Sequence, residues 1–214
     1  MAKAVVFDLD GTLIDSLPDI ADNVNITLEK FGAPKRTIEE IRSFIGNGAK
    51  NLIEKSFGGL TEEQLLERLS FYNKLYTASG SPKTHVFDGM GEVLTALKKR
   101  GYKIAILTNK PQITTNNVYE TYLKQYDFDK VVGQKDGVKI KPDPTVLLDM
   151  LAEMGVEKSE AYFVGDGDAD VKVALNAGIK SVSVLWGYRD KDYLEKLGAK
   201  IFVENTAQLL DILK

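Results

Sequence analysis

The chain has 214 residues, of which 43% are hydrophobic, and its formal net charge is −3. This length and composition fit one large domain or a core domain with a smaller insertion, and they exclude a disordered chain. The balance of charges argues against nonspecific nucleic-acid binding, which needs a basic surface. The chain has no cysteine and one histidine, His85, so disulfides, thiolate zinc sites and histidine metal clusters are excluded. Any bound metal must be held mainly by oxygen atoms, which favours Mg²⁺.

The sequence has no apolar run that approaches the roughly 18 residues needed to cross a membrane. It also lacks the basic start and the long apolar stretch of a signal peptide. We therefore expect a cytoplasmic protein, a monomer or a homodimer, with neither a membrane nor a nucleic acid as its partner.

The first apolar run, AVVF at 4–7, ends at two aspartates, Asp8 and Asp10. Residues two apart on a strand point to the same side, so the two carboxylates would repel each other. Burying such charges is costly. The pair therefore predicts a compensating cation or a shared proton at this position.

Further short runs rich in Val and Ile are predicted to be strands, at 103–108, 161–165, 181–186 and 200–203. These runs lack apolar–polar alternation, as expected for strands of a parallel sheet that are buried on both faces. Apolar residues with helical spacing separate several of the runs, in the segments 90–97, 147–151 and 171–175. Alternating helices and strands predict a doubly wound, Rossmann-like α/β sheet.

The stretch from 16 to 85 differs, because its pattern is helical throughout. Capping boxes are predicted at two helix starts, at Thr37 with Glu40 and at Thr61 with Gln64. An all-helical block after the first strand is best explained as a cap domain, 16–85, inserted into a catalytic core formed by 1–15 and 86–214. The linkers would lie near 14–18 and 79–88.

Polar residues stand where several predicted strands end. Asp8 and Asp10 follow the first strand, Thr108 ends the second, Asp166 follows the third, and Lys141 precedes a helix. In a parallel α/β sheet, ligands gather at the carboxyl ends of the strands. Each residue alone has an ordinary explanation, such as a helix cap, a strand end or a solvated surface charge. Their joint occurrence at these places favours a catalytic site.

The motifs DLDGT, LTN, KPDP and GDGDAD, in this order, resemble those of the haloacid dehalogenase superfamily of phosphohydrolases. The resemblance spans the whole chain, and the helical insert resembles the first (C1) cap type of this superfamily. Within the insert, the segment 44–58, FIGNGAKNLIEKSFG, is similar to the cap segment of phosphoglycolate phosphatases. LTNK is also typical of that branch.

The resemblance implies a role for each motif residue. Asp8 would be the nucleophile that forms an aspartyl phosphate, and Asp10 would be the general acid and base. Mg²⁺ would be held by Asp8, the backbone carbonyl of Asp10 and Asp166, with Asp170 in an outer shell. Lys141 would pair with Asp8. The residues expected to bind the phosphoryl group or to shape its turn are Gly11, Thr12, Thr108, Asn109, Lys110 and Lys141.

Two residues of the fourth motif depart from the family pattern. Gly167 stands where Ser or Thr commonly follows the first aspartate, and Asp168 adds a carboxylate. Asp168 would either join the metal shell or face solvent, and we expect it to face solvent.

The cap segment contains a second group of candidate residues. Gly46, Asn47 and Gly48 are expected to form a loop whose amides face a small anionic substrate, with Arg42 or Lys50 nearby. The alternative is a helix–helix turn with solvated basic residues, and the sequence favours neither explanation.

Together these observations predict a Mg²⁺-dependent phosphatase for a small phosphorylated metabolite, with 2-phosphoglycolate as the leading candidate. A mutase similar to β-phosphoglucomutase, in which Asp8 hands its phosphate to a sugar, would use the same motif residues. A non-catalytic binding protein of this fold is a third possibility, although the intact Asp8, Asp10, Lys141 and Asp166 argue against it.

Overall fold

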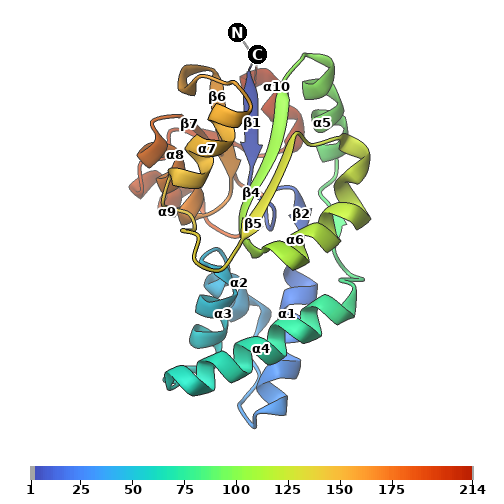
Figure 1. Ribbon diagram of the computed structural model, residues 1–214, viewed down its shortest axis with the longest axis vertical. Helices are drawn as coiled ribbons and strands as arrows, with labels where there is room; N and C mark the ends of the chain where they lie inside the picture. Colours follow the sequence, from blue (N-terminus) through green and yellow to red (C-terminus); the bar gives the residue numbers. More distant parts are fainter. Residues whose placement is uncertain (1–2, 214) are drawn as a thin grey trace.

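The computed structural model of the protein describes residues 3–213 and contains a central parallel sheet (Figure 1). Its strands are β1 (Ala4–Phe7), β4 (Lys103–Pro111), β5 (Lys130–Gln134), β6 (Ala161–Gly165), β7 (Lys180–Val184) and β8 (Ile201–Val203). They lie side by side in the order β5-β4-β1-β6-β7-β8, and every neighbouring pair is parallel. The doubly wound α/β sheet that the sequence predicted is thus confirmed.

Helices cover both faces of this sheet. They are α5 (Met90–Lys99), α6 (Gln112–Val118), α7 (Thr145–Glu153), α8 (Asp168–Ala177), α9 (Lys191–Lys196) and α10 (Leu209–Ile212). Alternation along β1 sends Val5 and Phe7 into the apolar cluster with α5 and α10, and Ala4 and Val6 into the cluster with α7 and α8. Fully burying a side chain such as Phe7 contributes about 1.5–3 kcal/mol, so β1 is fixed between two packed layers.

Two strands differ from the sequence prediction in ways that matter for the site. β5 was not predicted, because it is a short strand at the sheet edge, with two adjacent valines and mostly partial burial. β4 continues past its predicted end at 108 to Pro111. Since Phe7, the last residue of β1, pairs with Ile106, the end of β4 extends beyond β1 and carries residues 108–110 over the site.

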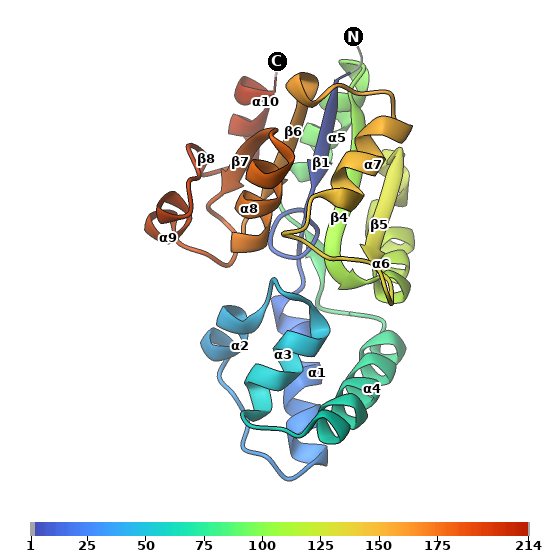
Figure 2. The same cartoon turned by 60° about the vertical axis from the view of Figure 1, so that its left-hand side comes forward.

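A helical unit lies beyond the carboxyl end of the sheet (Figures 1 and 2). It consists of α1 (Leu17–Lys30), α2 (Ile38–Phe44), α3 (Gly48–Phe57) and α4 (Glu62–Ser79). Both predicted capping boxes are present, at Thr37 with Glu40 and at Thr61 with Gln64. The unit buries its own apolar cluster, to which each of its four helices contributes, so its stability does not depend on the sheet alone.

Two chain segments join the helical unit to the sheet. Each segment contains a short strand, β2 (Ile14–Asp15) or β3 (His85–Val86), and the two strands pair in antiparallel fashion. The boundaries of the cap domain, 16–85, stay a prediction. Among the helices that the structure describes, none is long and apolar enough to cross a membrane.

Candidate active site

The turn after β1 places the first motif at the centre of the sheet edge. The backbone N–H of Asp8 donates to the carbonyl of Val164 in β6 at 2.9 Å. Gly11 then adopts a φ of +82°, and a Cβ at this position would lie 2.5 Å from Asp166 Oδ2. Both the backbone and the close approach therefore require glycine. The Thr12 hydroxyl donates to Asp166 Oδ1 at 2.9 Å and so fastens the turn to the fourth motif.

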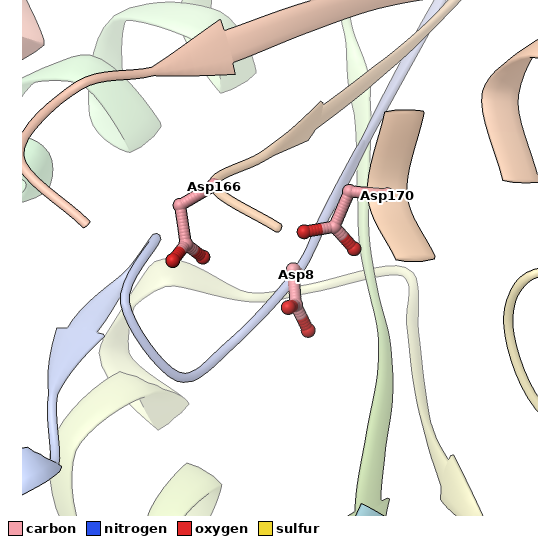
Figure 3. Close-up of side chains that lie close together, drawn as sticks. All are labelled: Asp8, Asp166 and Asp170. Atoms are coloured by element: carbon pink, nitrogen blue, oxygen red, sulfur yellow. The ribbon is translucent and has the colours of Figure 1, made fainter. Parts of the chain in front are cut away.

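Three buried carboxylates, of Asp8, Asp166 and Asp170, converge at the ends of β1 and β6 (Figure 3). One oxygen atom from each lies within 4.8 Å of the other two. Burial, followed by the negative charge of Asp170, raises the pKa of Asp8 to about 7 and that of Asp166 to about 8. The chain thus gathers more negative charge here than burial favours.

A buried lysine opposes part of this charge. Lys141 Nζ lies 2.6 Å from Asp170 Oδ1 and 2.9 Å from Asp8 Oδ1. Burial alone would lower the pKa of Lys141, but the carboxylates of Asp170 and Asp8 outweigh it and raise this pKa above its usual value. Asp170 also accepts from the backbone N–H of Gly167, at the start of α8, at 2.8 Å. Both oxygens of Asp170 are therefore engaged.

The carboxylate cluster fits a hard divalent cation. Asp8 Oδ1 is buried, and its polar contact among the described residues is the ion pair with Lys141 Nζ at 2.9 Å. The three donors are carboxylates, which suit hard cations such as Mg²⁺. A divalent cation between Asp8 and Asp166 would also relieve the repulsion that raises their pKa values.

The Asp10 carboxylate belongs to a second arrangement around Lys110. Lys110 Nζ lies 3.0 and 3.2 Å from the two oxygens of Asp10, and it donates to the hydroxyl of Tyr76 in α4 at 3.0 Å. The hydroxyl of Ser16 donates to Asp10 Oδ1 at 2.5 Å. Burial lowers the pKa of Lys110, but Asp10 and Tyr76 raise it above its usual value overall. The lysine therefore stays charged.

The sequence prediction that Asp8 and Asp10 share one side of a strand is wrong. β1 ends at Phe7, and Asp10 lies in the turn that follows. Each carboxylate consequently has its own buried lysine, Lys141 for Asp8 and Lys110 for Asp10. Two separate cations compensate the pair.

A cavity of about 60 Å³ lies between the sheet edge and the helical unit. Asp8 and Asp10 line it from the core, while Leu52, Tyr72 and Tyr76 line it from the helical unit. The helical unit therefore forms one wall of the space above the two aspartates.

The end of β4 contributes Thr108, Asn109 and Lys110 to this cavity. The Asn109 side-chain amide donates to the carbonyls of Gly46 and Lys141, both at 3.0 Å, and its oxygen accepts from the Lys141 N–H at 2.9 Å. Thr108 is buried, and its hydroxyl accepts from the Lys110 N–H at 3.2 Å. Asn109 thus ties the loop before α3 to the loop that carries Lys141.

The predicted cap loop is brought to the site only in part. Gly46 and Gly48 line the cavity, and Asn47 is the residue that precedes α3. Lys50 instead pairs with Glu62 at 2.9 Å and has a side chain that is 51% exposed. For Lys50, the geometry favours the alternative of a solvated basic residue.

The extra carboxylate of the fourth motif faces neither the metal cluster nor open solvent. Asp168 Oδ1 lies 4.0 Å from Arg189 Nε, Oδ2 lies 3.7 Å from Lys172 Nζ, and the side chain is 14% exposed. The prediction that Asp168 faces solvent is therefore wrong. Its role is to pair with cations beside the cavity.

Several residues near the site were missed by the sequence analysis, namely Ser16, Tyr72, Tyr76, Tyr188 and Arg189. Two signals could have found most of them. Tyr188 and Arg189 follow a predicted strand at its carboxyl end, where the rule that identified Thr108 also applies. Tyr72 and Tyr76 are four residues apart and so share one face of their helix.

The chain is similar to known proteins over almost its whole length. Residues 5–184 match the family model of haloacid dehalogenase-like hydrolases. Phosphoglycolate phosphatase 1 of Pseudomonas aeruginosa is 33% identical over 217 residues, which cover 98% of this chain and 79% of the relative. Phosphoglycolate phosphatase of Haemophilus influenzae is 33% identical over 222 residues, covering 99% of this chain and 98% of the relative.

A solved structure extends the similarity to the fold. A predicted phosphoglycolate phosphatase of Haemophilus somnus superimposes with a TM-score of 0.90 at 26% sequence identity, covering 100% of this chain and 98% of that chain. The family match spans the motifs around Asp8, Thr108, Lys141 and Asp166. The chain therefore belongs to the haloacid dehalogenase-like hydrolases.

Proposed function

We propose that this protein is a Mg²⁺-dependent phosphatase that hydrolyses a small phosphate monoester, 2-phosphoglycolate, through an aspartyl phosphate on Asp8. One observation carries the proposal. The Asp8 carboxylate lies at the base of a small cavity, paired with Lys141 and adjacent to two further buried carboxylates. A buried carboxylate with a cation at one side and an accessible cavity at the other is suited to nucleophilic attack.

In the first step, an oxygen of Asp8 attacks phosphorus and the bond between phosphorus and the ester oxygen breaks. Lys141 and the Thr108 hydroxyl would bind phosphoryl oxygens, and both residues are buried beside Asp8. Preorganised charge of this kind stabilises the transition state without reorganisation during the reaction. Asn109 would keep Lys141 and the cap loop in place through its three hydrogen bonds.

Asp10 would manage the protons of both steps. A protonated Asp10 would give its proton to the departing ester oxygen, and the resulting carboxylate would then accept a proton from the water that attacks the aspartyl phosphate. That second attack releases phosphate and restores the Asp8 carboxylate. Ser16 and Lys110 hold the Asp10 side chain by hydrogen bonds, which supports a fixed orientation during both transfers.

The metal ion would be held by the carboxylates of Asp8 and Asp166 and by the backbone carbonyl of Asp10, with Asp170 outside them. When bound, Mg²⁺ would neutralise the negative charge that repels an anionic substrate and would polarise the phosphoryl group. Two observations support Mg²⁺ at this site: the three clustered side chains all offer carboxylate oxygens, and the pKa values of Asp8 and Asp166 are raised.

The size of the cavity supports a small substrate. Its volume of about 60 Å³ is well below the ~300–1,000 Å³ of pockets that bind drug-sized ligands. To admit a sugar phosphate, the helical unit would have to lie further from the sheet than it does in this structure. The names of the relatives from Pseudomonas aeruginosa and Haemophilus influenzae support 2-phosphoglycolate as the substrate.

Measuring phosphate release from a panel of small phosphate esters, with and without Mg²⁺, tests the proposal. We expect 2-phosphoglycolate to give the highest kcat/KM, and we expect activity to disappear after exhaustive chelation and to return with Mg²⁺. Product analysis with a sugar phosphate and a bisphosphate activator distinguishes a mutase. Turnover of no ester, or full activity without divalent metal, would contradict the proposed function.

A further inference from the structure

The loop between α2 and α3 is a part of the helical unit that contacts the motif residues of the core, because Asn109 donates to the carbonyl of Gly46 at 3.0 Å. Gly46 of this loop and Gly48, the first residue of α3, line the cavity that Asp8 also lines. The loop cannot be placed by the helical unit alone, because glycine-rich loops have many accessible conformations. What fixes its position therefore has to be found among the core residues that touch it.

Arg189, in the core loop after β7, contacts the last carbonyls of α2. Its guanidinium donates to the carbonyl of Arg42 at 3.0 Å, of Ser43 at 3.1 Å and of Ile45 at 2.6 Å. Carbonyls at the end of a helix lack partners within the helix and carry its negative dipole. A guanidinium is well suited to them, because its planar fork donates several hydrogen bonds at once.

On the core side, the segment that carries Arg189 packs closely against Asp166. The backbone N–H of Tyr188 donates to Asp166 Oδ2 at 2.8 Å, and a Cβ on Gly187 would lie 2.2 Å from the Cβ of Asp166. Asp168 faces the Arg189 side chain, which is 14% exposed. Arg189 is thus anchored directly to the motif that carries the carboxylate cluster.

Two further hydrogen bonds join the core to α2 and to the loop. The Arg42 side chain of α2 donates to the carbonyl of Gly187 at 2.6 Å, so the two arginines exchange bonds between core and helical unit. Asn109 donates to the carbonyl of Gly46 at 3.0 Å. The loop is therefore held by core side chains from β4 and from the segment after β7.

From this geometry we infer that Arg189 is a positioning residue for substrate selection: it holds the Gly46–Gly48 loop over Asp8 by capping the end of α2. The inference rests on the proposed function only for the identity of the substrate. Arg189 acts through the loop, because its guanidinium is already occupied by the carbonyls. Without it, the loop would lose its fixed distance from Asp8, and a small substrate that depends on closure would be affected most.

The position of the helical unit can be measured directly, because the chain has no cysteine of its own. Spin labels on Lys55→Cys in α3 and Lys196→Cys in α9 would report the distance between two exposed sites, one on the helical unit and one on the core. With Mg²⁺ and aluminium fluoride bound, we expect one narrow distance distribution in the parent. Arg189→Gln should broaden this distribution and shift it to longer distances.

Kinetics give the second measurement. Hydrogen bonds from a charged donor are strong enough that Arg189→Gln should lower kcat/KM for 2-phosphoglycolate by about tenfold to a hundredfold. For p-nitrophenyl phosphate, whose leaving group is too large for the closed cavity, kcat/KM should change by less than about threefold. Arg189→Lys, which keeps the charge but not the fork, should give intermediate values in both measurements.

Arg100→Gln is the matched control. Arg100 also donates to carbonyls near the end of a helix, those of Leu210 and Leu213, but this helix, α10, lies at the end of the core away from the helical unit (Figure 1). We expect it to leave both the label distances and the substrate preference unchanged.

An unchanged distance distribution in a folded Arg189→Gln, or equal widening in Arg100→Gln, would overturn the inference. If Arg189→Gln does not fold, Arg189→Lys decides by the same criterion. If the parent does not hydrolyse 2-phosphoglycolate, the proposed function fails, while the distance measurement still tests the role of Arg189.

Discussion

The two aspartates of the first motif lie in differently built surroundings. Among the described residues, the charged groups that lie beside Asp8 are Lys141, Asp166 and Asp170, and all three come from the core. Asp10 instead pairs with Lys110 of β4, and Lys110 in turn donates to the hydroxyl of Tyr76 in α4 of the helical unit. The ion pairs on the Asp8 side of the site therefore involve no residue of the helical unit, whereas the lysine on the Asp10 side is held in part by the helical unit.

This difference suggests a division of labour. If the helical unit moves to admit substrate, the contacts of Asp8 persist, whereas Lys110 loses its hydrogen bond to Tyr76. Phosphoryl binding and metal binding should therefore depend little on closure, and proton transfer should depend on it strongly. Substitutions on the Asp8 side and on the Asp10 side should therefore have separable effects.

The largest effect is expected at Asp8, the proposed nucleophile. Asp8→Asn nearly preserves the size of the side chain but removes the oxygen nucleophile, so turnover of every phosphate ester should be abolished. Phosphate release measures the loss, and circular dichroism should show an unchanged fold. Asp10→Asn is the matched control, because it should slow turnover while still allowing an aspartyl phosphate to form from an ester with a good leaving group. Retention of more than trace activity by Asp8→Asn would show that Asp8 is not the nucleophile.

The second-largest effect is expected on the free energy of unfolding when each of the two buried lysines is replaced. Lys141→Met leaves Asp8 and Asp170 without their cation, and removing one partner of a buried ion pair costs about 3–5 kcal/mol. Lys110→Met should cost less, because Asp10 keeps the hydrogen bond from Ser16 and lines the cavity. Urea unfolding of both variants in the absence of Mg²⁺ gives the two free energies. Equal losses would show that the Asp8 side is no more dependent on its lysine than the Asp10 side.

Part of the site could be predicted from the sequence. Asp8 and Asp166 follow the ends of β1 and β6, and Thr108 lies in β4 just beyond the end of β1, so the order of the strands brings the three together. Lys141 could be identified because its motif resembles that of a known family. In these cases a local pattern and a general rule of topology were sufficient.

The remaining contacts depend on packing that has no sequence signal. Arg189 bonds to backbone carbonyls of α2, which lies more than 140 residues earlier in the chain, and carbonyls are the same in every residue type. The sequence around Lys50 does not specify which side of α3 faces the core, and the structure turns Lys50 toward Glu62. β5 was missed because its position at the sheet edge leaves most of its residues partly exposed.

The third prediction concerns metal and pH on the Asp8 side. Asp8 and Asp166 have pKa values of about 7 and about 8, against an ordinary value of 3.8. Between about pH 4 and pH 8 the folded protein therefore binds more protons than the unfolded chain, so the free energy of unfolding without metal should fall as pH rises. Mg²⁺ competes with these protons, so the stabilisation that it gives should grow over the same range.

Thermal unfolding at pH 5.5 and pH 8, with Mg²⁺ or with EDTA, measures this dependence. At saturating Mg²⁺ we expect the Tm to rise by about 5 °C at pH 8, and by clearly less at pH 5.5. Asp166→Asn, which removes one of the two carboxylates, should weaken the metal effect at both pH values. A larger Mg²⁺ effect at pH 5.5 than at pH 8 would contradict the assignment of the raised pKa values.

The smallest effect is expected where the helical unit meets Lys110. Tyr76→Phe removes the hydroxyl that accepts from Lys110, and one such bond to a charged group is worth about 1.5–3 kcal/mol. Because water can replace the hydroxyl, we expect a fall in kcat of only about threefold to tenfold, with the Mg²⁺-dependent Tm shift unchanged. Tyr72→Phe is the control, since Tyr72 packs beside Tyr76 on the same helix without a hydrogen bond to Lys110. If Tyr76→Phe instead weakened the Mg²⁺ effect and left kcat intact, the helical unit would act on the Asp8 side of the site, and the separation into an Asp8 side and an Asp10 side would be wrong.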